Sequence, residues 1–259
     1  MAFDTLLVRI DDRIATITVN RPDKRNALNG TVRREMVDAL DMLREERDVR
    51  VVILTGAGDK AFIAGADIRE FAERTPIQQR AAMEGRRVFD ELAEFPKPTI
   101  SMINGYALGG GCEVALACDL RVAGTSARLG QPEVKLGILP GGGGTQRLPR
   151  LVGFGRAMRL VLTGELIGAE EAERIGLVDF LVADDELRDF TYDLATTLAA
   201  QSPVAMRLAK QAVRYAMETP LSAGLRHERE LFVTAFSSED RAEGVAAFLE
   251  RREPAFSGR

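Results

Sequence analysis

Two glutamates stand directly after turn-forming residues and are the strongest candidates for chemistry in this chain. Glu113 ends the run 104–113 (NGYALGGGCE), and Glu133 ends the run 129–133 (LGQPE). Histidine and cysteine are scarce, because the 259 residues include one histidine and two cysteines. Acid–base chemistry therefore falls to carboxylates. A carboxylate pair beside a glycine-rich backbone predicts one group that gives a proton, one that activates water, and amides that hold a developing anion.

Each of these features also has a simpler explanation when taken alone. Glu113 in the first turn of a short helix would match the helix dipole, and Glu133 after a proline would be an exposed loop residue. Glycines 109–111 let backbone amides approach a ligand, or else only close a tight turn. The apolar neighbours Cys112 and Val114 favour a half-buried carboxylate at position 113.

The composition is that of an ordinary globular protein and excludes several classes. Hydrophobic residues make up 46% and charged residues 29%, with a net charge of −4, which argues against nucleic acid as a partner. Two cysteines in apolar settings predict reduced thiols and a cytoplasmic location. The start of the chain (MAFDT) has no signal-peptide pattern, and no long uncharged apolar run predicts a membrane span.

The pattern of elements predicts an α/β core followed by helices. Strands are expected within 6–20, and at 51–54, 99–103 and 120–123, with helices at 29–47, 76–94 and 110–118. After Asp184 only helices are expected, at about 184–200, 203–217, 220–236 and 238–250. Such an all-helical end is either a separate lobe or an assembly surface.

Other familiar motifs are absent or incomplete. Gly56-Ala57-Gly58 follows a strand as in a dinucleotide fingerprint, but no helix opens after it. The chain has no phosphate-binding Gly-Lys-Ser/Thr loop and no Gly-x-Ser-x-Gly elbow. His227 lies in a charged run and is expected on a solvated helix face, so neither a zinc site nor a Ser-His-Asp site is predicted.

Four motifs, taken in order, carry a resemblance to a known family. They are residues 62–68 (FIAGADI), 104–113, 130–133 (GQPE) and 140–148 (PGGGGTQRL). Together they resemble the enoyl-CoA hydratase/isomerase (crotonase) superfamily, and its hydratases most of all, over nearly the whole chain. The resemblance implies an α/β, crotonase-like (ClpP/crotonase) spiral of ββα units over residues 1–195. It also implies a helical trimerisation region over 196–259, with trimers often paired into hexamers.

The resemblance further implies residue roles. Glu113 and Glu133 match the two catalytic glutamates, and Ala66 and Gly110 match the backbone donors of the oxyanion hole. The positions that match coenzyme A contacts are Arg25, Ala27, Ala64, Asp67, Ile68, Phe248 and Arg251, the last two acting across subunits. The segment near residues 71–90 borders the acyl pocket. No cofactor and no metal is implied, since the acyl-CoA thioester is the substrate.

The implied reaction agrees with the chemistry expected from the residues. Water adds across the 2,3 double bond of a 2-trans-enoyl-CoA, as in fatty acid β-oxidation, and the thioester oxygen gains negative charge. Glu133 is expected to supply the proton to Cα, and Glu113 to help activate the water. Three other functions remain open: a Δ3,Δ2-enoyl-CoA isomerase, another acyl-CoA-processing member, or a non-catalytic binding protein on the same fold.

Overall fold

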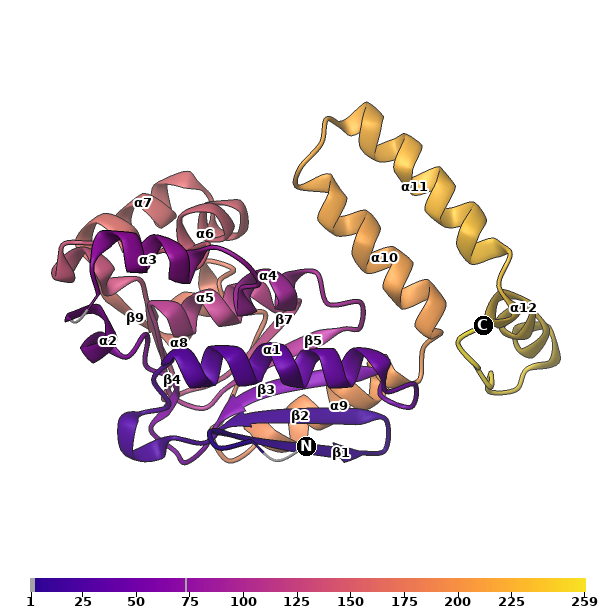
Figure 1. Cartoon of the computed structure of the whole chain (residues 1–259). Coiled ribbons are helices and arrows are strands. Elements are labelled where there is room, and N and C mark those ends of the chain that lie inside the picture. The colour runs from indigo at the N-terminus through magenta and orange to yellow at the C-terminus, as the bar shows by residue number, and fades with distance from the viewer. Residues whose placement is uncertain (1–2, 73) are drawn as a thin grey trace.

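The protein is described by a computed structural model that covers residues 3–72 and 74–259. Met1 and Ala2, which begin the segment expected to lack a signal peptide, lie outside the described residues. So does Glu73, within the segment assigned to the acyl pocket. Two sheets and their covering helices form the body, and three C-terminal helices extend to one side (Figure 1).

The larger sheet has the strand order β1-β2-β3-β5-β7-β10. The first two strands are antiparallel and the others pair in parallel. Its strands are β1 (Leu6–Asp11), β2 (Ile14–Val19), β3 (Val51–Gly56), β5 (Thr99–Ile103), β7 (Leu120–Gly124) and β10 (Phe180–Val182). Strands β3 and β5 are buried along their whole length, as their continuous apolar runs predicted.

The smaller sheet has the order β4-β6-β8-β9, formed by β4 (Ala61–Ile63), β6 (Tyr106–Leu108), β8 (Arg128–Gly130) and β9 (Leu166–Gly168). Each of its first three strands follows one strand of the larger sheet along the chain. The chain therefore gives one strand to each sheet in turn, and this alternation builds the expected spiral.

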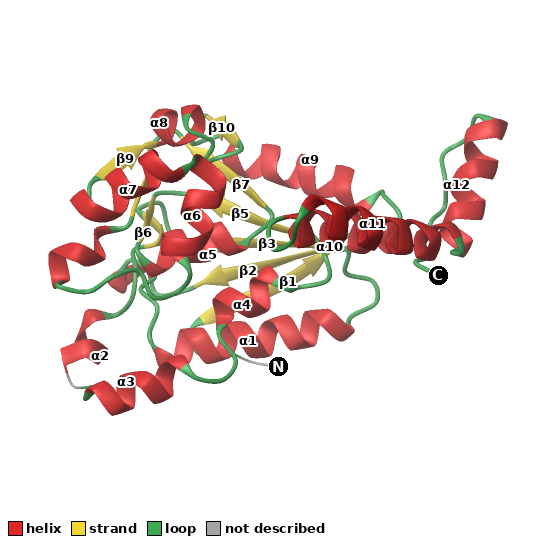
Figure 2. Cartoon of the chain, turned by 90° about the horizontal axis from the view of Figure 1, so that it is seen from above, coloured by secondary structure: helices red, strands yellow, loops and turns green. Residues whose placement is uncertain are grey.

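Helices cover both faces of the larger sheet. Those of the body are α1 (Gly30–Glu45), α2 (Ile68–Ala72), α3 (Pro76–Met83), α4 (Val88–Ala93), α5 (Gly110–Ala117), α6 (Gly144–Val152), α7 (Phe154–Thr163), α8 (Ala169–Arg174) and α9 (Leu187–Ala199), with short 3₁₀ helices η1 (Pro22–Lys24) and η2 (Pro132–Leu136). Helix α9 packs on one face, where its Leu187 and Ala195 join Ile53, Ile100 and Val122. Helices α1, α4 and α5 contribute to the main core on the other side (Figure 2).

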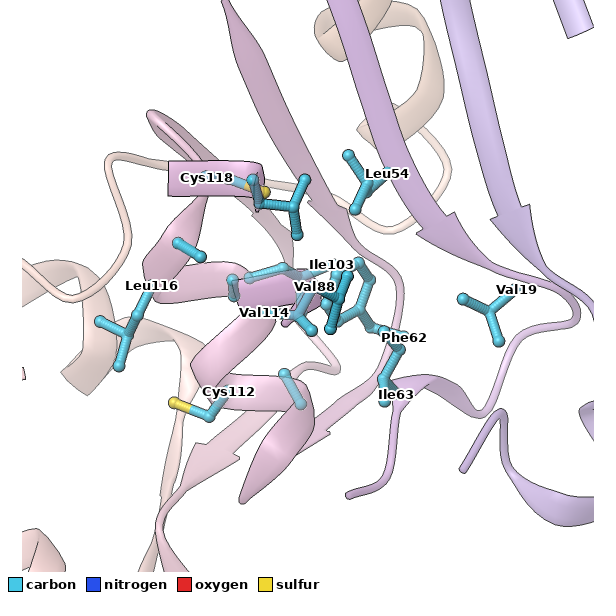
Figure 3. Close-up of a cluster of buried hydrophobic side chains, with 14 of the residues drawn as sticks. Val19, Leu54, Phe62, Ile63, Val88, Ile103, Cys112, Val114, Leu116 and Cys118 are labelled. Atoms are coloured by element: carbon cyan, nitrogen blue, oxygen red, sulfur yellow. The ribbon is translucent and has the colours of Figure 1, made fainter. Parts of the chain in front are cut away.

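The main core lies between the two sheets and around α5. Phe62 of β4, Ile103 of β5 and Val114 of α5 belong to one buried cluster (Figure 3). Every residue of α5 from Gly111 to Ala117 is buried. The helix is therefore fixed on all sides, and a carboxylate that it carries is held in place by the core.

The expected helix over 76–94 is wrong as a single element. Helix α3 ends at Met83 and α4 begins at Val88, with Gly85 between them at φ 86°. This backbone conformation strongly favours glycine, so Gly85 breaks the helical pattern that the apolar spacing predicted. Thr75 begins α3 with a capping box to Gln78.

The C-terminal helices are α10 (Pro203–Ala216), α11 (Leu221–Phe236) and α12 (Glu239–Glu250). Helices α10 and α11 run side by side (Figures 1 and 2), and α12 follows α11 with its start beside the start of α10, where the Ser202 hydroxyl donates to Asp240 at 2.6 Å. The expected boundary at 195/196 falls inside α9, and the division into two domains stays a prediction. Among the residues described, no helix combines the length and the apolar character needed to cross a membrane.

His227 is half-buried, although full exposure on a solvated helix face was expected. Its ring stacks on Tyr215 of α10 with 4.2 Å between ring centroids, and its buried Nε2 has no hydrogen-bond partner among the described residues. The contact between α10 and α11, which the charged run around His227 does not reveal, explains the difference.

Candidate active site

Three consecutive glycines at the start of α5 bring the chain close to β4 of the smaller sheet and to Glu133. Gly109 has a φ of 50°, and a Cβ atom placed on it would lie 2.9 Å from Oε1 of Glu133. A Cβ atom on Gly111 would overlap the carbonyl oxygen of Ile63. The glycine run therefore serves tight packing at position 111 and close approach to a carboxylate at position 109.

Glu113 projects from the first turn of α5 and is 3% exposed. One of its oxygens, Oε1, accepts hydrogen bonds from the N–H groups of Gly142 at 2.6 Å and Gly144 at 2.8 Å. Burial raises the pKa of Glu113, while these two donors and then the charges of Arg87 and Arg147 oppose the rise. Oε1 is thus occupied, and Oε2 accepts no hydrogen bond from the described residues.

Glu133 lies in η2 and is 9% exposed. Burial raises the pKa of this carboxyl group to about 7, its own backbone N–H lowers it, and the charge of Glu113 raises it further. The two predicted carboxylates are therefore brought into electrostatic contact in one buried region. A group with a pKa near neutrality can be protonated or ionised at working pH, as an acid–base catalyst requires.

Gln131 is a functional candidate that the sequence reasoning missed. It is 1% exposed, and its amide nitrogen, oriented to satisfy both side chains, lies 3.0 Å from Oε1 and 3.2 Å from Oε2 of Glu133. The sequence signal that could have identified Gln131 was its position between Gly130 and Pro132. The N–H donors of Gly142 and Gly144 were also missed, because the four-glycine run reads equally well as a flexible loop.

The backbones of Ala66 and Gly110 lie close together, as the resemblance requires of an oxyanion hole. A Cβ atom on Gly110 would lie 3.7 Å from the nitrogen of Ala66. Around Ala66, Leu28 N–H donates to the carbonyl of Gly65, and Asp67 N–H donates to the carbonyl of Leu28. Within the described residues, neither the Ala66 N–H nor the Gly110 N–H donates to an acceptor of the chain. Both are available to a ligand oxygen, and their assigned role stays a prediction.

Five of the seven positions assigned to coenzyme A lie on two neighbouring segments. Ala64 N–H donates to the carbonyl of Arg25 at 3.1 Å, which joins the segment 25–28 to the segment 64–68. Arg21 links both segments, because it donates to the carbonyl of Ala27 at 2.6 Å and to the carboxylate of Asp67 at 3.3 Å. Ile68 is exposed at the start of α2.

Phe248 and Arg251 are not brought to this site within one chain. Phe248 is 83% exposed on α12. Both views place α12 at the opposite end of the molecule from α2 (Figures 1 and 2). A contact between these two residues and the same ligand therefore requires a second copy of the chain.

A pocket of about 290 Å³ adjoins the segment of Arg25. Three of its lining residues, Arg25, Lys60 and Arg128, are cations, and Asp59 is the acidic member. The lining includes neither Glu113 nor Glu133, so the pocket is separate from the carboxylates. Its excess of positive charge suits an anionic group such as a phosphate.

A sequence model of the enoyl-CoA hydratase/isomerase family matches residues 9–259. The chain belongs to this family. Among its relatives, the probable enoyl-CoA hydratase echA8 of Mycobacterium tuberculosis is 47% identical over 259 residues and all of both chains. The short-chain-enoyl-CoA hydratase of Clostridium acetobutylicum is 44% identical over 98% of this chain and 97% of its own.

The solved structures confirm the fold of this family member. The enoyl-CoA hydratase from Bacillus anthracis superposes with a TM-score of 0.94 at 41% identity, covering 99% of this chain and 100% of its own. The predicted family and the predicted crotonase-like fold are therefore both correct, and the chain is a member of an enzyme family.

Proposed function

We propose that the protein is an enoyl-CoA hydratase that reversibly adds water to a 2-trans-enoyl-CoA and forms a 3-hydroxyacyl-CoA. The observation that carries this proposal is the pairing of two buried carboxylates in unlike surroundings beside two unused backbone donors. Glu113 is held by two N–H groups, whereas Glu133 has a pKa raised to about 7. Two carboxylates in different environments take different proton-transfer roles.

The thioester oxygen is proposed to lie between the N–H groups of Ala66 and Gly110. When water attacks Cβ, electrons move through the double bond toward this oxygen, which gains negative charge. Two preset donors stabilise that charge by roughly 3 kcal/mol each, by analogy with other oxyanion holes. The positive end of α5, which begins at Gly110, favours the same charge.

The protons are proposed to follow the two carboxylates. Ionised Glu113 takes a proton from the attacking water through Oε2, and the hydroxyl bonds to Cβ. Protonated Glu133 gives its proton to Cα, which completes the addition. The cycle closes when the proton on Glu113 returns to Glu133 directly or through solvent, so no cofactor is required for the balance.

The coenzyme A portion is proposed to bind along the segments 25–28 and 64–68. Coenzyme A carries phosphate groups, and the cationic pocket next to Arg25 offers them Arg25, Lys60 and Arg128. A relative named short-chain-enoyl-CoA hydratase fits a substrate of this class. We place the reaction in fatty acid β-oxidation and the protein in the cytoplasm, where the buried free thiols of Cys112 and Cys118 stay reduced.

Self-assembly through the C-terminal helices is part of the proposal, as a trimer or a pair of trimers. The exposed apolar side chains there include Val213, Leu221, Phe232, Val233, Phe236 and Phe248. Such a surface is rare on a monomer. Changing both Phe232 and Phe236 to glutamate should give monomers in sedimentation velocity, whereas Leu7→Glu on the exposed side of β1 should not. A wild-type monomer would contradict the assembly.

The deciding experiment follows the loss of enoyl-thioester absorbance with crotonyl-CoA. Wild-type protein should turn over, Glu113→Gln and Glu133→Gln should each lose at least about 100-fold in kcat, and the exposed Glu186→Gln should not. No wild-type activity on short, medium or long 2-enoyl-CoAs would overturn the proposal. A 3-enoyl-CoA assay tests the isomerase function, because one carboxylate suffices for that reaction.

A further inference from the structure

The loop that holds Glu113 is itself held by an arginine from another element. Arg87, which precedes α4, donates from its guanidinium to the carbonyl oxygen of Gly141 at 2.7 Å. The carbonyl of Gly141 and the N–H of Gly142 belong to one planar peptide unit. That N–H donates to Oε1 of Glu113 at 2.6 Å. A single rigid group therefore joins the guanidinium to the carboxylate.

We propose that Arg87 is a positioning residue for Glu113, acting through the peptide between Gly141 and Gly142. This inference rests on the proposed role of Glu113 in activating water. A cation at the carbonyl end of a peptide increases the positive charge at its N–H end, because hydrogen bonds in a chain polarise one another. The same contact fixes the plane of the peptide and so the direction of the N–H.

Arg147 has a different place in the same network. It donates to the carbonyl of Gly142 at 2.8 Å and to Asp90 at 3.1 Å. The peptide that it contacts carries the N–H of Gly143, which does not bond to Glu113. Arg147 thus stiffens the loop, whereas Arg87 acts on the peptide that touches the carboxylate.

The neighbouring charges determine the expected direction of change. Glu113 faces Arg87 before α4, Arg147 on α6 and Glu133 in η2, while the thiol of Cys112 on its own helix has a pKa raised to about 12 and stays neutral. Arg87 and Arg147 favour the ionised form of Glu113. Removal of Arg87 should therefore favour the protonated form, which cannot accept a proton from water.

Arg86 provides a matched control for the test. It is the adjacent residue with the same side chain, but it pairs with Asp41 of α1 and Glu91 of α4. Arg87→Gln removes the contact with Gly141, Arg87→Lys keeps the charge and a single donor, and Arg86→Gln leaves the network at Glu113 intact.

The test titrates Glu113 by NMR in protein labelled with carbon-13 at glutamate Cδ, with its signal assigned by its loss in Glu113→Gln. Arg87→Gln should move the midpoint upward by about one pH unit, and should shift the Gly142 amide proton upfield. Arg87→Lys should fall in between, and Arg86→Gln should match wild type. An unchanged midpoint and Gly142 shift in Arg87→Gln would overturn the inference.

A kinetic measurement separates this inference from the proposed function. In Arg87→Gln, kcat for crotonyl-CoA should fall about tenfold at neutral pH, with KM unchanged and the acid limb of kcat moved to higher pH. Equal losses in Arg86→Gln would contradict a specific role. If wild-type protein shows no hydration although the titration shifts as expected, the coupling to Glu113 stands and the hydratase assignment fails.

Discussion

Gly142 supports Glu113 with its backbone N–H and leaves space for it by lacking a side chain. Its N–H donates to Oε1 of Glu113 at 2.6 Å, and a Cβ atom placed on it would lie 2.5 Å from Oε2. The same Cβ atom would lie 2.7 Å from Cζ of Phe89. Because glycine has no side chain, position 142 leaves space for Oε2 of Glu113.

A methyl group at position 142 should displace the Glu113 carboxylate. Gly142→Ala is expected to lower kcat at least about 100-fold and to destabilise the fold by about 1–3 kcal/mol, since the added methyl group would overlap both Glu113 and Phe89. Gly141→Ala is the control, because its Cβ atom would meet Cε of Met83 at an ordinary 3.6 Å. The measurements are crotonyl-CoA hydration and urea unfolding. Equal activity of the two variants would contradict the assigned geometry.

Glu133 should reduce stability at the pH at which it works. Its pKa is raised to about 7 in the folded protein against 4.5 for an ordinary glutamate, so the folded state holds the proton more tightly than the unfolded state. Stability from this group is therefore present below about pH 4.5 and lost as pH rises to about 7. At pH 8, Glu133→Gln should unfold at a higher urea concentration than the wild type, with a free energy of unfolding larger by up to roughly 3 kcal/mol. This gain should be absent at pH 4. A variant less stable at pH 8 would contradict the burial of this charge.

Gln131 should set the pH at which Glu133 works. A hydrogen bond to the ionised carboxylate is stronger than one to the neutral acid, so loss of the amide should raise the pKa of Glu133. Because the protonated form is proposed to supply the proton to Cα, hydration should decline as pH rises through that pKa. Gln131→Met is expected to move this alkaline limb of kcat to higher pH, while the exposed Gln146→Met should leave it unchanged. A limb that moves to lower pH would contradict the assigned contact.

Local sequence patterns predicted the parts of the fold that depend on near neighbours. Asn29 was expected at the start of a helix, and its side chain accepts from Val32 N–H at the start of α1. The continuous apolar run 51–54 formed the buried β3. In both cases the determining contacts lie within a few residues or follow from burial on both faces.

The rest depended on contacts between distant residues. The donors to Glu113 stand 29 and 31 positions further along the chain, and no periodicity in the sequence joins them. The four glycines around them were therefore weakly informative until the fold placed Glu113 beside them. Likewise, the break at Gly85 depends on a backbone angle, and the stacking of His227 depends on how α11 lies against α10.

The attachment of the C-terminal helices depends on Asp119, which follows α5. This carboxylate pairs with Lys210 at 2.6 Å and with Arg214 at 2.9 Å, both on α10, and accepts from the Thr99 N–H at 2.8 Å. Lys210 is largely buried, and burial lowers its pKa while Asp119 raises it. Asp119 is thus the anion that compensates a buried cation.

Asp119→Asn should leave Lys210 buried without a full counter-charge. The free energy of unfolding is expected to fall by about 2–4 kcal/mol. This is less than the cost of breaking a fully buried ion pair, because the carboxylate of Asp119 is partly exposed. Urea unfolding measures this loss, with the exposed Asp193→Asn as control, and hydrogen exchange should become faster in α10. Adding Lys210→Met to Asp119→Asn should recover part of the stability, because the uncompensated cation is then removed. If the double variant is no more stable than Asp119→Asn, the loss comes from the contacts of Asp119 with Thr99 and Arg214, and the charge of Lys210 does not cause it.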